Sequence, residues 1–272
     1  MRQSSELKLE TIRLDRPAAG VVVATLDRPE RMNAMTVVMF AELDRLAAAL
    51  DQEDDLRVLI ITGAGDRAFC AGYDLDDAAG LSELSPMQML DRQEHAARAL
   101  SAIRSIRVPV IAAVNGVAAG GGLSLALAAD IRLASPAARF NAAFVRIGLS
   151  AGDLGASWLL PRIVGPALAA ELAYTGRFMA ADEAERAGLV NRVVAAADLL
   201  DEAIAMAALI CANSPAGVQL SKRALQANME ITSYAAALEL EDRGQALLTR
   251  GEDMPEALAA FKAKRAPTFT GR

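Results

Sequence analysis

The stretch VPVIAAVNGVAAGGGLSLALAADI, from Val108 to Ile131, decides the fold of this chain. Residues Pro109 to Val114 are short, branched and apolar, as in a buried strand, and Asn115-Gly116 then interrupts them. Gly120 to Gly122 follow, directly before a helical run of small residues. Because glycine loses more backbone entropy on folding than any other residue, three in a row indicate a backbone that needs φ > 0 or very close approach of other atoms.

The helix start after these glycines can serve chemistry or only packing. A helix N-terminus carries unpaired N–H groups and the positive end of the helix dipole, which suits a phosphate or an oxygen that becomes negative during a reaction. Alternatively, the glycines form a tight turn where strand and helix pack closely. The number of glycines alone leaves both interpretations open.

Composition narrows the class of protein. The chain has 272 residues, 53% of them hydrophobic, which excludes disorder and allows one large domain or two small ones. With 28 basic and 34 acidic residues the net charge is −6, so no global field favours nucleic acid or an anionic membrane. Cys70 and Cys211 form neither a disulfide framework nor a metal-ligand pair, and we expect no bound metal and a reducing, cytoplasmic location.

The sequence favours neither a secretion signal nor a membrane span. The N-terminal sequence MRQSSELKLE lacks the apolar segment of a secretion signal, so we expect no export. The uncharged run from Val108 to Ala129 is long enough to span a bilayer, but it contains Pro109, Asn115, four glycines and Ser124. No belt of Trp or Tyr surrounds it, so a buried strand followed by a helix explains the run better.

Hydrophobic periodicity divides the rest of the chain into strands and helices. We expect strands at residues 7–14, 20–26, 56–62, 109–114, 130–134 and 190–194, the first two antiparallel. We expect helices at residues 37–50, with Thr36 as cap, at 86–106, and from 166 and 181. From Asp198 onward the pattern is helical, with breaks near Pro215, Gly251 and Pro255. This change predicts a strand-and-helix core over residues 1–197 and a helical region over residues 198–272.

Two stretches carry a family resemblance. FCAGYDL, from Phe69 to Leu75, together with Pro109 to Ile131, resembles the enoyl-CoA hydratase/isomerase, or crotonase, superfamily. Leu26 to Met35 resembles the early loop of that family, Tyr174 to Val190 a later loop, and Ala260 to Arg265 its tail. The resemblance therefore covers nearly the whole chain.

The resemblance implies a fold and a ligand. The fold is α/β, the crotonase spiral of repeated ββα units related to ClpP, followed by a helical C-terminal region that forms trimers. The resemblance also implies an acyl-CoA thioester as ligand, with no cofactor beyond its CoA moiety. It leaves open whether the assembly is a homo-trimer or a dimer of trimers.

The resemblance also places an oxyanion hole and a CoA site. In the family two backbone N–H groups hold the thioester oxygen, and by position they fall on Tyr73 and Gly121. Backbone donors tolerate any side chain, so a tyrosine is acceptable there. Arg31 and Ala71, with Phe261 and Lys264 of a neighbouring subunit, match positions that hold the CoA nucleotide. The alternative for Arg31 is an ordinary surface charge.

The catalytic positions depart from the family pattern. Hydratases of this family use two glutamates, and their positions carry Ser124 and Phe144 here. Serine is too weak an acid without an activating base and phenylalanine cannot titrate, so hydration by the usual mechanism is not expected.

Asp153 is the remaining candidate acid or base. Aligned backward from Leu160-Pro161, it resembles the aspartate that carries a proton in the dienoyl-CoA isomerase branch, although its loop is one residue longer. Burial among apolar neighbours would raise its pKa toward a useful range. The alternative is an N-cap for a helix starting near Leu154.

Three functions remain open from the sequence. The first is an enoyl-CoA hydratase/isomerase-type enzyme, a lyase or isomerase of fatty acid metabolism, that stabilises an enolate and relies on Asp153. The second is an acyl-CoA-binding protein without catalysis. The third is a serine hydrolase of related fold that uses Ser124 with His95, the only histidine, although no G-x-S-x-G sequence surrounds this serine.

The other acidic residues singled out have structural interpretations. Asp74 and Asp130 match family positions that flank the two glycine-containing loops. Glu239 and Glu241 belong to a late helix and are expected to face solvent.

Overall fold

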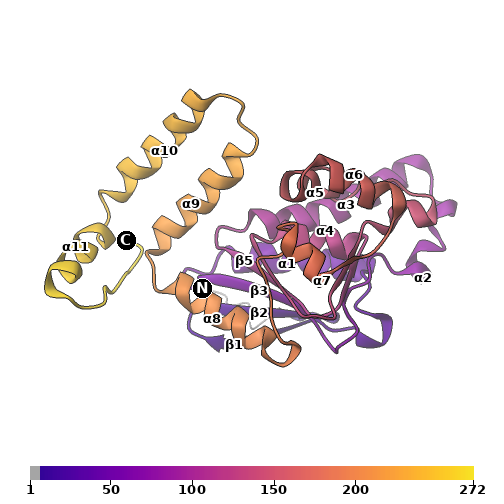
Figure 1. Cartoon of the computed structure of the whole chain (residues 1–272), viewed down its shortest axis with the longest axis horizontal. Coiled ribbons are helices and arrows are strands. Elements are labelled where there is room, and N and C mark those ends of the chain that lie inside the picture. The colour runs from indigo at the N-terminus through magenta and orange to yellow at the C-terminus, as the bar shows by residue number, and fades with distance from the viewer. Residues whose placement is uncertain (1–6) are drawn as a thin grey trace.

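The computed structural model describes residues 7–272, and two sheets form its centre (Figure 1). The larger sheet has the order β1-β2-β3-β5-β7-β10, with bounds β1 Ile12–Ala18, β2 Val21–Leu26, β3 Val58–Gly63, β5 Val110–Val114, β7 Ile131–Ala134 and β10 Arg192–Val193. The smaller sheet has the order β4-β6-β8-β9, with bounds β4 Ala68–Cys70, β6 Val117–Ala119, β8 Arg139–Asn141 and β9 Met179–Ala180.

The chain alternates between the two sheets in repeated turns. β3, β5 and β7 lie in the larger sheet in parallel, and each is followed directly by a strand of the smaller sheet, β4, β6 and β8. Helical segments follow each of these pairs. This confirms the predicted α/β spiral of strand-strand-helix units. β1 pairs antiparallel with β2, as predicted, although it begins at Ile12.

Helices cover the sheets and form the C-terminal region. The α-helices are α1 Val37–Leu50, α2 Leu75–Ala78, α3 Pro86–Ser105, α4 Gly121–Ala128, α5 Ala156–Val164, α6 Pro166–Thr175, α7 Ala181–Arg186, α8 Leu199–Cys211, α9 Pro215–Asn228, α10 Tyr234–Leu248 and α11 Asp253–Ala263. Short 3₁₀ turns are η2 Pro29–Arg31, η3 Leu81–Glu83, η4 Ala143–Ile147 and η5 Ala196–Asp198. Thr36 caps α1 as predicted, because its side chain accepts a hydrogen bond from the Met39 amide.

The sequence did not predict the smaller sheet. Its strands have two or three residues each, too few to display a period of two. The predicted break near Pro255 was also wrong, because this proline lies in the first turn of α11, where a missing N–H costs nothing.

The stretch from Val108 to Ile131 becomes β5, β6 and α4. All residues of β5 and α4 are buried, which is the buried strand and helix that the sequence favoured over a membrane span. Within residues 7–272 no single helix has the length and apolar character of a membrane span. The segments of α8 and α9 meet these criteria only when taken together, and they are bent by 106° relative to each other.

The C-terminal helices attach to the core in two ways. α8 packs on one face of the larger sheet, and α9, α10 and α11 extend away from it (Figure 1). Leu199, Ala203 and Ala207 are the buried residues of α8 on that face. α8, which starts directly after the proposed boundary near residue 198, packs on the sheet of the core.

A buried ion pair ties α9 to both ends of the central stretch. The Lys222 ammonium lies 2.8 Å from Asp130 Oδ2 and donates to the Val108 carbonyl at 2.8 Å. Asp130 Oδ2 also accepts from the Val110 amide. Burial lowers the pKa of Lys222, and the nearby Asp130 carboxylate acts in the opposite direction. Asp130 therefore has the structural role expected for it.

Replacing Lys222 by methionine should destabilise the protein by about 3 kcal/mol, because it leaves the Asp130 carboxylate and the Val108 carbonyl without their buried partner. Urea unfolding measures the difference. Lys8→Met, at an exposed position, is the control and should change the free energy of unfolding by less than about 0.5 kcal/mol. Equal stability of the two variants would show that the ion pair does not hold α9.

Candidate active site

Two bends of backbone meet at the start of α4. Gly72 has φ +99°, and a Cβ there would lie 2.8 Å from the Ala119 carbonyl oxygen and 3.5 Å from the Gly121 amide nitrogen. A Cβ at Gly122 would overlap the Cys70 carbonyl. Only glycine permits this approach, so the glycines form the close-packed turn of the second interpretation, and that turn brings two loops together.

The N–H groups of Tyr73 and Gly121 are not used by the secondary structure around them. Tyr73 forms a single parallel bridge with Met35, in which the Met35 amide donates to Gly72 and the Asp74 amide donates to Met35. The hydrogen bonds that join residues 7–272 include none donated by the backbone of Tyr73 or Gly121. Two unpaired donors on adjacent bends are what a carbonyl oxygen gaining negative charge requires.

The dipole of α4 is aligned with this role. Its first residue is Gly121, so its positive end lies at the bend. At the other end the buried Arg132 guanidinium donates to the carbonyls of Ala126 and Ala129. Burial lowers the pKa of Arg132 to about 10, so it remains a cation at neutral pH and neutralises the negative end of the helix.

The Tyr73 side chain is held beside the bend. Its ring stacks on Phe40 with 6.0 Å between centroids, and its hydroxyl accepts hydrogen bonds from Nε and Nη2 of Arg92. Burial raises the pKa of this phenol. Arg92 was not singled out from the sequence, where it is one of several charges in a long amphipathic helix.

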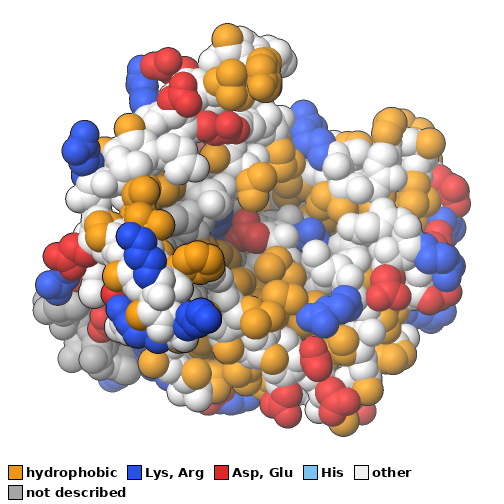
Figure 2. Space-filling model, turned by 60° about the vertical axis from the view of Figure 1, so that its left-hand side comes forward, with side chains coloured by type: hydrophobic (Ala, Val, Ile, Leu, Met, Phe, Trp, Pro, Cys, Tyr) orange, Lys and Arg blue, Asp and Glu red, His pale blue; other side chains and the backbone are white. Residues whose placement is uncertain are grey.

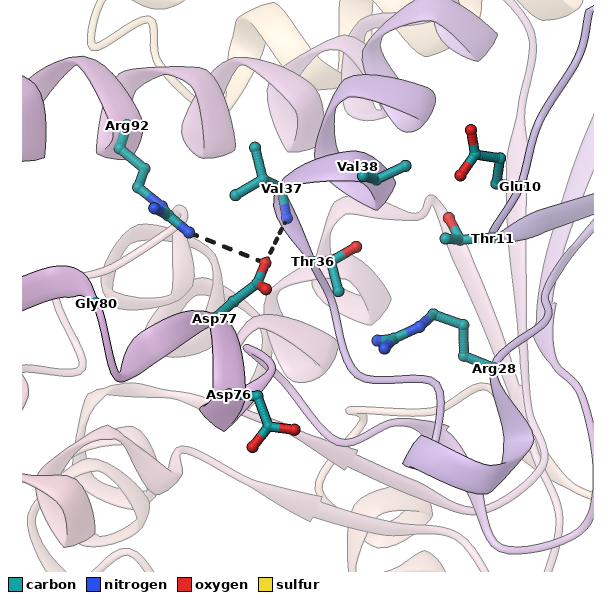
Figure 3. Close-up of a pocket in the computed structure, with 10 residues that line it drawn as sticks. All are labelled: Glu10, Thr11, Arg28, Thr36, Val37, Val38, Asp76, Asp77, Gly80 and Arg92. Atoms are coloured by element: carbon teal, nitrogen blue, oxygen red, sulfur yellow. Dashed lines mark hydrogen bonds and ion pairs between the residues drawn. The ribbon is translucent and has the colours of Figure 1, made fainter.

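A cavity of about 560 Å³ lies next to Arg92, between the start of α1, α2 and α3 (Figure 3). Asp77 points toward Arg92 and accepts a hydrogen bond from the first amide of α1, at Val37. The charged groups around the cavity are of both signs: Glu10, Arg28, Asp76, Asp77 and Arg92. Its lining is thus not the uniformly basic surface of a dedicated phosphate site.

Asp153 lies in the loop between η4 and α5. Its Oδ1 accepts a hydrogen bond from the Gln93 side-chain amide, and burial raises its pKa. The N-cap interpretation was wrong: α5 begins at Ala156, Gly155 precedes it, and no side chain caps it. Leu154, which follows Asp153, has φ +47°, and its Cδ1 would lie 3.3 Å from a Cβ on Gly121. This brings the Asp153 loop against the bend.

The positions of the missing glutamates are buried. Ser124 is fully buried in α4, and its Oγ has no hydrogen-bond partner in the described part of the chain. Phe144 is also buried, with a ring carbon 3.9 Å from a Cβ position on Gly120. His95 is exposed and its Nδ1 contacts the Asp91 carbonyl of its own helix. The structure thus argues against Ser124 as a nucleophile activated by His95.

The expected CoA-binding residues lie in two places. Arg31 donates to Asp74 and Asp76, so its charge is already partnered, while the Ala71 amide donates to the Met32 carbonyl. Burial raises the pKa of Asp74, but hydrogen bonds from Arg31 and Arg28 outweigh it and bring the pKa to about 2.

Phe261 and Lys264 lie at the end of α11, remote from α4 within one chain (Figure 1). Phe261 is 84% exposed. Their use at the site therefore requires a second chain.

Glu239, Glu241 and Cys70 do not lie in surroundings that favour catalysis. Glu239 pairs with Arg243, and Glu241 accepts from Asn228, both on exposed surfaces as expected. Burial raises the pKa of the Cys70 thiol to about 12. Across residues 7–272 no group of three or more His, Cys, Asp or Glu side chains could hold a metal ion.

Comparison with known proteins identifies the family. The family model described as enoyl-CoA hydratase/isomerase matches residues 16–272. The chain belongs to the enoyl-CoA hydratase/isomerase family. Proteins of this family act on CoA thioesters.

Individual relatives of this family member carry different names. It is 41% identical to a "Probable enoyl-CoA hydratase echA12" of Mycobacterium bovis, over 94% of this chain and 92% of the relative. It is 38% identical to the "1,2-epoxyphenylacetyl-CoA isomerase" of Escherichia coli, over 93% and 96%. A solved structure of a putative enoyl-CoA hydratase from Streptomyces coelicolor matches with a TM-score of 0.93 at 38% identity, covering 98% of this chain and 96% of that one.

Gly122→Ala should destabilise the protein by at least about 3 kcal/mol, because the new methyl group must push the Cys70 carbonyl and the β4 backbone aside. Thermal unfolding measures this. Gly244→Ala is the matched control: the position is open and lies inside α10, so alanine should stabilise by about 0.5–1 kcal/mol. A Gly122→Ala protein as stable as the original would contradict the close approach.

Proposed function

We propose that this protein is an enoyl-CoA isomerase that shifts the double bond of a 3-enoyl-CoA, with Asp153 as its single proton carrier. One observation carries the proposal: a half-buried carboxylate belongs to a loop packed against the bend where two backbone N–H groups lack partners. No second titratable side chain stands at the positions where hydratases of this family have glutamates.

The chemistry needs one base and one oxyanion hole. Asp153 removes a proton from C2 of the 3-enoyl thioester, and the electrons move into a dienolate whose oxygen accepts hydrogen bonds from Tyr73 and Gly121. The protonated Asp153 then returns the proton to C4, and the double bond ends between C2 and C3. The same proton is taken and returned, so no water or co-reactant enters the balance.

Isomerisation is favoured over hydration on chemical grounds. Hydration needs water to be activated and a proton to be delivered, and the family's two acidic positions hold Ser124 and Phe144, both buried. The E. coli relative is named an isomerase, whereas the M. bovis relative is named a probable hydratase, so names alone do not decide. The single carboxylate supports proton transfer along the acyl chain.

We further propose that the CoA moiety is held between chains in a trimer or dimer of trimers. Arg31 and Ala71 would contribute from one chain, and Phe261 and Lys264 from another. The C-terminal helices expose large apolar side chains, namely Leu225, Tyr234, Leu247, Leu258 and Phe261. Figure 2 displays hydrophobic side chains around a hollow in the face that these helices border. Contact with other copies of the chain would cover such surfaces.

Asp153→Asn should lower kcat for a 3-enoyl-CoA by about 10²–10⁴-fold, because asparagine keeps the shape and cannot carry the proton. The formation of the conjugated 2-enoyl thioester is followed by its ultraviolet absorbance. Asp198→Asn, on the surface at the start of α8, is the control and should leave kcat unchanged. Full activity of Asp153→Asn would end the proposal; tight acyl-CoA binding by the original protein with no turnover would favour the binding protein instead.

Activity should fall on acidification in a range above that of an ordinary aspartate. Burial raises the pKa of Asp153 above 3.8, and a base acts only when ionised, so kcat/KM should rise with pH through this higher value and then level off. A pH–rate profile with a 3-enoyl-CoA measures it. A profile without an acid limb above pH 3.8 would contradict the role of Asp153.

A further inference from the structure

The side-chain contact that orients Asp153 comes from a distant helix. Gln93 lies in α3, 60 residues before Asp153, and its Nε2 donates to Oδ1 of that carboxylate. Both residues are half-buried. A hydrogen bond between an amide and a carboxylate in a partly dry site is stronger than the same bond in water, so this contact fixes the carboxylate rotamer.

The loop that carries Asp153 has few other anchors for its side chain. It lies outside any helix or strand, between η4 and α5, and Leu154 takes the left-handed conformation that bulky residues rarely adopt. Three factors set the pKa of Asp153: burial raises it, and hydrogen bonds from the Gln93 amide and the Leu154 N–H lower it. We interpret the strained backbone beside Asp153 as a means of holding its carboxylate in one direction.

Three arginines on the helices next to this loop have partners other than Asp153. Arg92 of α3 is bound to the Tyr73 hydroxyl, and Arg162 of α5 donates to the Trp158 carbonyl and lies over its ring. Arg104 of α3 also lies over that ring. No charged side chain in the described part of the chain contributes to the pKa shift of Asp153.

A neutral donor suits a proton carrier. An arginine at position 93 would hold the carboxylate ionised and oppose its protonation during the reaction. An amide offers an N–H without a full charge, so the carboxylate can accept a proton from C2 and still release it to C4. Gln93 partly offsets the effect of burial, which raises the pKa of Asp153.

The same helix also contacts the other half of the site. Arg92, the residue before Gln93, donates two hydrogen bonds to Tyr73, whose backbone N–H is one of the two proposed oxyanion donors. Adjacent residues of a helix point about 100° apart, so α3 lies between the Tyr73 loop and the Asp153 loop. A capping box of Ser85 and Gln88 starts this helix, which stabilises its position.

We propose that Gln93 is a positioning residue, which holds the Asp153 carboxylate in the orientation and ionisation state that proton transfer along the acyl chain requires. This inference rests on the proposed isomerase function.

The test compares Gln93→Met with Arg98→Met, which places the same side chain at an exposed position of α3. With a 3-enoyl-CoA, Gln93→Met should lower kcat about tenfold with KM nearly unchanged, and should move the acid limb of kcat/KM upward by on the order of one pH unit, because a donor to the ionised form is lost. Gln93→Glu should move the limb at least as far, because a second carboxylate disfavours ionisation. Arg98→Met should change neither.

A second readout needs no turnover. In a ¹³C NMR titration of carboxyl-labelled aspartate, with Asp153→Asn to assign the signal, the pKa of Asp153 should be higher in Gln93→Met than in the original protein. An unchanged titration and an unchanged acid limb would overturn the proposal, as would a loss of kcat with no shift of the limb. If Asp153→Asn is inactive while Gln93→Met behaves as the original, the isomerase proposal stands and the positioning role fails; full activity of Asp153→Asn ends both.

Discussion

The structure depends on the contact between two peptide backbones at Gly72, Gly121 and Gly122. No side chain separates the loop after β4 from the start of α4, so the amides of Tyr73 and Gly121 lie on adjacent bends with no partner in the secondary structure. Strands of both sheets, the helix α4 and the buried Arg132 of β7, which binds the C-terminal end of α4, surround this contact. In the proposed site the oxyanion donors belong to the backbone, so they do not depend on the type of side chain at these positions.

The proposed isomerase function separates two tasks at this site. Stabilisation of an enolate oxygen by two fixed donors is independent of residue type, whereas proton transfer needs a titratable side chain in one place. By the resemblance, Ser124 and Phe144 stand at the family's usual acidic positions, and we propose that the catalytic carboxylate is instead Asp153 in the loop before α5. One carboxylate is sufficient for an isomerisation in which a proton is removed and returned.

Features that depend on local sequence patterns could be predicted from the sequence. The glycines and the strand before them were visible, because period and glycine content reflect local backbone needs. The repeated strand-strand-helix organisation was expected only from the resemblance to the family. The smaller sheet was missed because its strands are too short to show a period. The cap interpretation of Asp153 was wrong because the additional residue in its loop, with Leu154 at positive φ, moves the helix start to Ala156. Arg92 and Gln93 were missed because only tertiary structure brings a helix 60 residues away against Asp153.

The measurement that tests the account most directly is isotope-edited infrared difference spectroscopy of a bound acyl-CoA labelled with ¹³C at its thioester carbonyl. If the Tyr73 and Gly121 amides both donate to that oxygen, the carbonyl band shifts to lower wavenumber on binding than it has in water, because two fixed donors polarise the bond. A band that stays at its position in water while the acyl-CoA is bound would contradict the oxyanion hole and with it the proposed function.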